Sequence, residues 1–235
     1  MAVASPDWQV YDLCNYDMQP SRSNSVEKGN LRSLGVPRRS WLDAWQKEGM
    51  RRTVYAVVLC HFDELPCLLL SDSLEASQSG VQPAWCRYRL LGGKVAPGES
   101  DIECLNRKLR RCILRVDEKQ SKCEWTVGEK LFTFWRPEFD EFVYPYLPSY
   151  VQRPKECISV YQVVLPHKCV LRSRPGCEIR SIPLTTIYKE GVSEFGKVIS
   201  AIPQALSRFN LKLYATVKTH RRESQSAASR KRIRY

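Results

Sequence analysis

The segment that most constrains the fold covers residues 92–113 and reads GGKVAPGESDIECLNRKLRRCI. Its glycines allow a tight backbone turn and a close approach to a ligand. The SDIE that follows is a capping box, which predicts that a helix begins there. Apolar residues then recur at helical spacing, and we expect them to form a buried stripe of Ile102, Leu105, Leu109, Cys112 and Ile113. The segment therefore predicts a strand, a glycine loop and an amphipathic helix, in this order.

The outward face of this helix is expected to be basic, because it carries Arg107, Lys108, Arg110 and Arg111. Such a face attracts anions and repels Mg²⁺. Metal-assisted phosphate hydrolysis needs clustered oxygen ligands that bind the ion and activate water. The acidic residues of the segment sit at the helix start, where they suit the helix dipole and the cap; they are Glu99, Asp101 and Glu103. The pattern therefore argues against a metal site and a hydrolase.

Strand and helix patterns alternate along the rest of the chain, which predicts a mixed α/β sandwich. The expected strands are 53–62, a strand starting at Pro66, 86–91, a strand ending at 132–135, and 158–165. A short helix is expected at 41–50, with Trp41, Leu42 and Trp45 on one face. A second helix is expected to be entered at Phe195–Gly196 and interrupted at Pro203.

These patterns divide the chain into three regions. Residues 1–50 are an N-terminal extension, irregular to residue 40 and ending in the short helix. Residues 51–212 form the folded domain, which includes a polar loop at 71–84, and residues 213–235 are a basic disordered tail. No apolar run approaches the ~20 residues of a membrane helix, and the start lacks a secretory signal, so we expect a soluble intracellular protein.

Net charge is the strongest compositional signal, at +12. The residues from 216 onward contribute +6 of it, since they hold seven Lys or Arg and one Glu. A basic body with a basic tail favours polyanionic partners, of which nucleic acid is the commonest. The compact SRKRIR favours nuclear import or RNA contact, although a solvated tail would explain it too. The ten cysteines form no C-x-x-C pair and the three histidines lie far apart, so zinc-ligand spacing is absent.

The glycine loop and helix resemble the first half of the Nudix box, since Gly93, Glu99 and Arg107 fit G-x5-E-x7-R. The family pattern continues R-E-U-x-E-E-x-G-U, where U is aliphatic. The chain departs from this second half, because the positions of the three glutamates and the late glycine are filled by Lys108, Arg111, Cys112 and Leu114. The resemblance therefore implies a Nudix fold without catalytic residues, metal ligands or a cofactor.

Further stretches resemble, in the same order, the small Nudix subunit of cleavage factor Im, from about residue 8 to residue 214. They are VYDLCNY, GMRRTV, LLGGKVAPGE, WRPEF, YPYLPSYVQRPKE and FGKVISAIPQALSRFN. The resemblance implies a catalytically silent α/β/α sandwich with a mixed sheet, which forms a homodimer in the nucleus. It also implies binding to UGUA-like elements of single-stranded pre-mRNA, and a larger subunit carrying an RRM as partner.

The positions that read RNA in this family transfer to Glu27, Arg38 or Arg39, Tyr55, Arg87 with Tyr88 and Leu90, and Phe195–Gly196. Three of them depart from the family, and one of these is Phe195, which stands where the family has a tyrosine. Tyr55 replaces a glutamate, so a hydroxyl and a ring stand where a carboxylate would accept hydrogen bonds. Arg87 replaces a stacking phenylalanine and would lie over a base as a planar cation.

Each of these residues also has a purely structural interpretation. Glu27 would be a solvated loop charge, Phe195 would be packed at a helix start, and either Arg87 or Tyr88 would face the core of a strand. Two alternatives to RNA reading therefore stay open. One is a dimeric scaffold that has lost or altered its base specificity, and the other is a residual nucleotide-binding Nudix protein.

Overall fold

A seven-stranded mixed sheet forms the centre of the computed structural model, which describes residues 5–19, 38–73, 87–114, 125–140, 142–173 and 176–215. The strand order is β11-β4-β3-β9-β8, and the short β5 and β6 add to β4 and β3. Only β3 and β9 run parallel within this sheet, which confirms the mixed class. The strands are β3 (Arg51–Phe62), β4 (Leu65–Ser73), β5 (Tyr88–Arg89), β6 (Leu91–Lys94), β8 (Thr126–Arg136), β9 (Glu156–Val164) and β11 (Cys177–Pro183).

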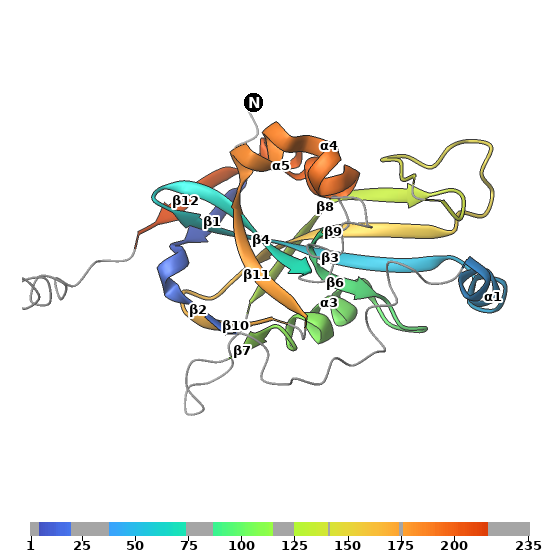
Figure 1. Cartoon of the computed structure of the whole chain (residues 1–235), viewed down its shortest axis with the longest axis horizontal. Helices are drawn as coiled ribbons and strands as arrows, with labels where there is room; N and C mark the ends of the chain where they lie inside the picture. The colour runs from blue at the N-terminus through green and yellow to red at the C-terminus, as the bar shows by residue number, and fades with distance from the viewer. Residues whose placement is uncertain are drawn as a thin grey trace, which may run out of the picture.

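Helices cover both faces of the sheet, as the α/β/α expectation requires (Figure 1). On one face, α3 (Asp101–Leu109) packs over the even-numbered residues of β3 from Val54 to Cys60. On the other, α4 (Leu184–Ser200) and α5 (Ile202–Leu206) pack over Val57 and Leu59. The run VYAVVLC is apolar at nearly every position because the strand is buried on both faces. No helix in the described part of the chain is long and apolar enough to span a membrane.

The start of α3 confirms the predicted capping box. The Ser100 hydroxyl accepts from the Glu103 amide at 3.2 Å, and the Glu103 carboxylate accepts from the Ser100 amide at 2.8 Å. Leu105, Leu109 and Cys112 are buried as expected. Ile102 was expected in the same stripe but is 52% exposed. The buried face is centred between Cys104 and Leu109, so Ile102 falls at its edge in the first turn.

The N-terminal segment is not irregular throughout, which corrects the expectation for residues 7–19. It forms β1 (Asp7–Tyr11), the 3-10 turn η1 (Leu13–Asn15) and β2 (Tyr16–Gln19). The first strand pairs in parallel with β12 (Asn210–Tyr214), so the expected tail boundary at residue 213 falls inside a strand. A separate three-stranded sheet joins β2 to β10 (Cys169–Arg172) and β7 (Ile113–Leu114).

Three further boundaries differ from the expectations. The strand expected at 86–91 is divided at Leu90, where the chain leaves β4 as β5 and joins β3 as β6. The last long helix begins at Leu184, not near Phe195, and bends at Gly191 and Gly196. It ends at Ser200, and Pro203 lies in the first turn of α5, where a missing amide hydrogen costs nothing. The predicted short helix is α1 (Arg38–Glu48), which starts three residues early.

Candidate nucleic-acid interface

A pair of aromatic rings marks the candidate interface on the α4 side of the sheet. Tyr88 of β5 and Phe195 of α4 lie with ring centroids 5.1 Å apart at 31°. Phe195 is buried and Tyr88 is partly exposed, and Leu90 is buried in the same apolar cluster. At Gly196 the backbone has φ 72°, a conformation that favours glycine. The structure thus brings together four of the predicted RNA-reading residues.

The Arg87 side chain also lies beside the Tyr88 ring, and it is held there by Asp72. Its guanidinium lies 4.8 Å from the Tyr88 ring centroid and donates two hydrogen bonds of 3.0 Å to the Asp72 carboxylate. Those hydrogen bonds raise the pKa of Arg87 further. Arg180 of β11 also pairs with Asp72 at 3.0 Å. Sequence reasoning missed both residues. Asp72 was expected in the polar loop 71–84 but lies in β4, which extends to Ser73, and Arg180 lies in a strand that was not predicted.

Tyr55 lies on the same face of the sheet, packed against the same apolar cluster. Its cross-strand partner is Gly92, where an added Cβ would come within 2.1 Å of the Val54 carbonyl oxygen. Glycine is therefore required for β6 to run this close to Tyr55. Burial raises the pKa of the Tyr55 hydroxyl, so the group stays protonated and offers a donor where a carboxylate would only accept.

The remaining predicted RNA-reading residues are Arg38, Arg39 and Glu27. Arg38 and Arg39 begin α1, which Figure 1 places at the end of the sheet where β3 starts, away from α4. Glu27 lies outside the described residues, as do residues 216–235 of the basic tail and most of the polar loop 71–84.

The carboxylates of the glycine loop are all engaged by neighbouring protein groups. Arg107 donates two hydrogen bonds of 2.6 Å to Glu99, and this lowers the Glu99 pKa to about 2. Asp101 accepts from Arg52 and, at 2.9 Å, from the Tyr161 hydroxyl, while Glu103 serves the helix cap. These carboxylates therefore already have cationic or hydrogen-bonding partners.

The positions of the Nudix glutamates do not fit a divalent metal. The Lys108 ammonium lies 3.3 Å from the place of a Cβ on Gly93, so a fixed positive charge stands over the loop. Arg111 is exposed and Cys112 is buried. No group of three His, Cys, Asp or Glu side chains in the described ranges is arranged to hold a metal ion. A second cation beside Lys108 would be repelled, and water activation has no support here.

Comparisons with known proteins agree in pointing to one family. The model of NUDIX_2, described as a nucleotide hydrolase, matches residues 6–209. Cleavage and polyadenylation specificity factor subunit 5 of Dictyostelium discoideum is 30% identical over 84% of this chain and 92% of its own length. Pre-mRNA cleavage factor Im 25 kDa subunit 2 of Arabidopsis thaliana is 34% identical over 73% of this chain and 80% of its own. Subunit 1 of the same plant is 33% identical over 70% and 69%.

Proposed function

Because the chain belongs to the Nudix family, and within it to the cleavage factor Im 25 kDa subunits, we propose that it is a non-catalytic RNA-binding subunit of the pre-mRNA cleavage and polyadenylation machinery. The relatives' names associate them with pre-mRNA cleavage and polyadenylation. The finer proposal concerns the RNA and the residues that read it. The observation that carries it is the Tyr88–Phe195 ring pair beside Tyr55 and Arg87.

Charge supports the non-catalytic part of the proposal. Hydrolysis on a Nudix scaffold needs a metal held by carboxylates, and this loop carries Lys108 and paired carboxylates instead. This argument disfavours hydrolysis in the alternative of a residual nucleotide-binding Nudix protein.

Single-stranded RNA suits the aromatic group. Unstacked bases bind by stacking on aromatic rings or guanidinium planes and by hydrogen bonds to their edges. Tyr88 and Arg87 offer the stacking surfaces, since they lie at the exposed side of the pair. Tyr55 offers a hydroxyl donor in place of the family's carboxylate. We propose that these residues, with Leu90 and Gly196 beside the ring pair, recognise UGUA-like elements.

The remaining features of the proposal rest on the family resemblance. Glu27 and either Arg38 or Arg39 would complete the base contacts from the N-terminal segment. The protein would act as a homodimer in the nucleus, beside a larger subunit that carries an RRM.

Fluorescence anisotropy with the full chain tests this function. A labelled UGUA-containing RNA is compared with a scrambled RNA of the same composition, because binding through the basic tail does not depend on sequence and falls steeply with salt. We expect wild type to bind the UGUA-containing RNA more tightly than the scrambled RNA. In Tyr88→Leu we expect the ratio of the two affinities to fall by about tenfold. Tyr188→Leu is the matched control, since Tyr188 is a 79% exposed tyrosine of α4 outside the ring pair.

Equal binding of both RNAs by the wild type would support the scaffold alternative. One observation favours that alternative. Arg87 is hydrogen-bonded to Asp72 and its guanidinium covers the neighbouring Tyr88 ring. A base must therefore displace the guanidinium or stack on the outer face of that guanidinium. Preference retained by Tyr88→Leu would contradict the proposed site.

A further inference from the structure

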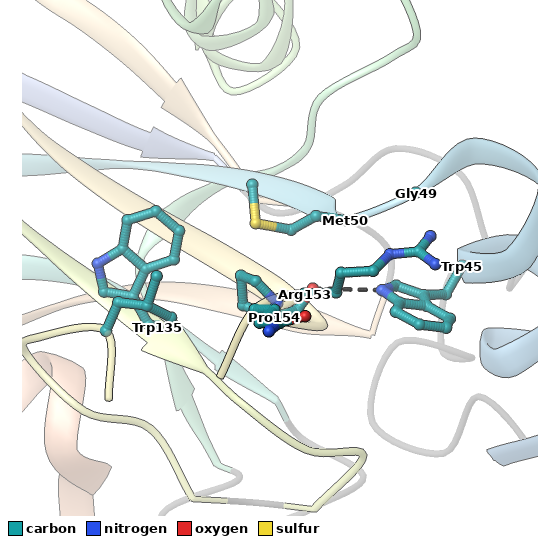
Figure 2. A pocket seen from close by; sticks show the side chains of 8 residues that line it. Trp45, Gly49, Met50, Trp135, Arg153 and Pro154 are labelled. Carbon is teal, nitrogen blue, oxygen red and sulfur yellow. Dashed lines mark hydrogen bonds between the residues drawn. The ribbon is translucent and has the colours of Figure 1, made fainter. Parts of the chain in front are cut away.

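A second aromatic pocket lies at the end of the sheet, between α1 and the loop that precedes β9. Figure 2 shows Trp135 and Trp45 at opposite ends of it, with Met50 and Pro154 between them in this view. The cavity has a volume of about 380 Å³, and its remaining lining comes from Gly49, Leu147, Gln152 and Arg153. Neither the family comparison nor the proposed function assigns it a role.

The pocket is preorganised by the docking of α1. The Trp45 indole donates a hydrogen bond of 3.2 Å to the Pro154 carbonyl oxygen. Its ring meets Phe139 edge-on at 5.9 Å and lies 3.8 Å from the Lys155 ammonium. Trp45 therefore has a fixed orientation before any ligand arrives, which lowers the entropy cost of binding.

This pocket faces the other side of the sheet from the Tyr88–Phe195 pair. Phe134 packs into the cluster beneath α4 and α5. Side chains alternate along a strand, so Trp135 points to the α3 side. Its cross-strand partner is Cys157, and Arg52, opposite Cys157 on β3, bonds to Asp101 at the start of α3. The two aromatic sites are thus separate surfaces of one domain.

The surroundings of the pocket are basic. The lining contains one guanidinium and one amide but no carboxylate. Two cations lie over the Trp45 ring, Arg153 at 4.6 Å and Lys155 at 3.8 Å from its centroid. Arg51, Arg136 and their partner Glu156 gather at Trp41 on the opposite side of the sheet and belong to a separate group.

Interleaved indole rings and cations are the composition of a single-stranded nucleic-acid platform. A nucleotide has a flat apolar base for the indoles and a phosphate for Arg153, and Gln152 offers an amide for a base edge. A cationic ligand such as a methylated lysine is excluded by charge. An acidic peptide would match the positive charge. Its apolar side chains, however, stack less well than a flat base on the indole rings and the guanidinium plane.

We propose that the Trp45–Trp135 pocket binds a second base of the same single-stranded RNA, with Arg153 on the adjoining phosphate. This inference rests on the proposed RNA-binding function and extends it to the α3 side of the sheet. A short RNA would occupy the Tyr88–Phe195 site alone, whereas a longer one would reach both sites.

Two RNAs test the proposal with the full chain, one of about 6 and one of about 16 nucleotides, both carrying UGUA. Arg153→Gln removes an exposed cation and leaves the fold intact, and Trp135→Leu removes an indole. We expect each to weaken binding of the long RNA by about tenfold and to leave the short RNA unchanged. Arg153→Lys is expected to restore most of the binding, since it restores the charge. Long RNA carrying 4-thiouridine should cross-link to the peptides that contain Trp45 or Trp135.

Arg208→Gln is the matched control, because it removes the same charge from a side chain of similar exposure. Its partner Glu129 lies near the start of β8, about 20 Å along the strand from Trp135. We expect its affinity for long RNA to stay within about twofold of wild type.

The proposal is overturned if both pocket variants bind the long RNA like wild type and no cross-link maps to either tryptophan. Binding of a labelled peptide of alternating Glu and Phe that is lost in Arg153→Gln, while RNA binding is not, would assign the pocket to a protein segment and also overturn it. These results leave the proposed function standing if the short RNA still shows UGUA preference. Loss of that preference with retained cross-links at Trp45 or Trp135 would instead contradict the first site alone.

Discussion

At the scale of single residues, the Asp72 carboxylate organises the candidate interface although it touches no solvent. Its side chain is fully buried on β4. The Arg87 guanidinium reaches it from the turn before β5, and the Arg180 guanidinium reaches it from β11. One buried negative charge thus fixes two cations beside the Tyr88 ring. Arg87 lies in the turn before β5, and this pairing holds its side chain in place.

Replacing Asp72 should therefore disturb both stability and the interface. Asp72→Asn leaves two arginines without their buried partner, and we expect a loss of about 2 kcal/mol in the free energy of unfolding. The loss is at the low end for a broken buried pair because both arginines reach solvent. Urea denaturation measures it. Arg180→Gln removes one partly exposed member of this ion-pair group and should lower the free energy of unfolding by about 0.5 kcal/mol. Equal losses for the two variants would contradict this account.

The acid response of the protein should depend in part on Glu99. Arg107 holds the Glu99 pKa at about 2, below the ordinary value of 4.5. A folded-state pKa below the unfolded one stabilises the protein above about pH 4.5, and this stabilisation is lost as the pH falls toward 2. We expect Glu99→Gln to show a smaller loss of stability than wild type between about pH 5 and about pH 3 in urea denaturation. Glu138→Gln, at an exposed loop position, should follow the wild-type curve.

At the scale of elements, local patterns predicted those parts whose cause is local. The α3 cap was predicted because the side chains of Ser100 and Glu103 each accept a hydrogen bond from the other's backbone amide within one turn. The strand β3 was predicted because its segment is rich in β-branched residues. The division at Leu90 was missed, since it depends on where β4 and β3 lie in space. The start of α4 at Leu184 was missed because Gly191 and Gly196 interrupt the helical pattern that would have revealed it.

The glycine loop makes the sharpest prediction at this scale. An alanine at Gly92 would place its Cβ 2.1 Å from the Val54 carbonyl oxygen and 2.9 Å from the Tyr55 Cα, both backbone atoms that cannot move aside cheaply. We expect Gly92→Ala to destabilise the protein by on the order of 3 kcal/mol. Gly98→Ala is the control, since Gly98 also has positive φ but no atom within 4 Å, and it should cost about 1 kcal/mol. Thermal unfolding of both variants distinguishes steric clash from backbone strain.

At the scale of the whole molecule, the first and last described strands lie side by side. Asp7 is opposite Asn210 in the β1–β12 register, and the Asp7 carboxylate pairs with Lys212 at 2.5 Å. Trp8 and Phe209 meet edge to face at 5.2 Å. No sequence pattern predicts which distant strand will be a partner. The N-terminal segment pairs with a strand near residue 210, and for this reason its sequence alone looked irregular. For the same reason, the Asp72 pairing escaped prediction, whereas the ring residues of the interface were found through the family resemblance.

Truncation tests the importance of this pairing. A chain ending at Ala215 keeps β12, and we expect its Tm to stay within about 2 °C of the full chain. A chain ending at Phe209 lacks β12 and leaves β1 with an open edge, so we expect its Tm to fall by about 8 °C. Differential scanning calorimetry measures both, and equal Tm values for the two truncated chains would show that β12 contributes nothing to the fold.

The β1–β12 pairing also sets an order of events during translation. Asp7 and Asn210 are 203 residues apart, so at about 5–20 residues per second the ribosome needs about 10–40 s between synthesising the two. Throughout that interval β1 is a nascent strand without its partner, available to chaperones or to another chain's free edge. Pairing of β1 is therefore complete only after β12 has been synthesised, and the speed of elongation determines how long the unpaired strand is exposed.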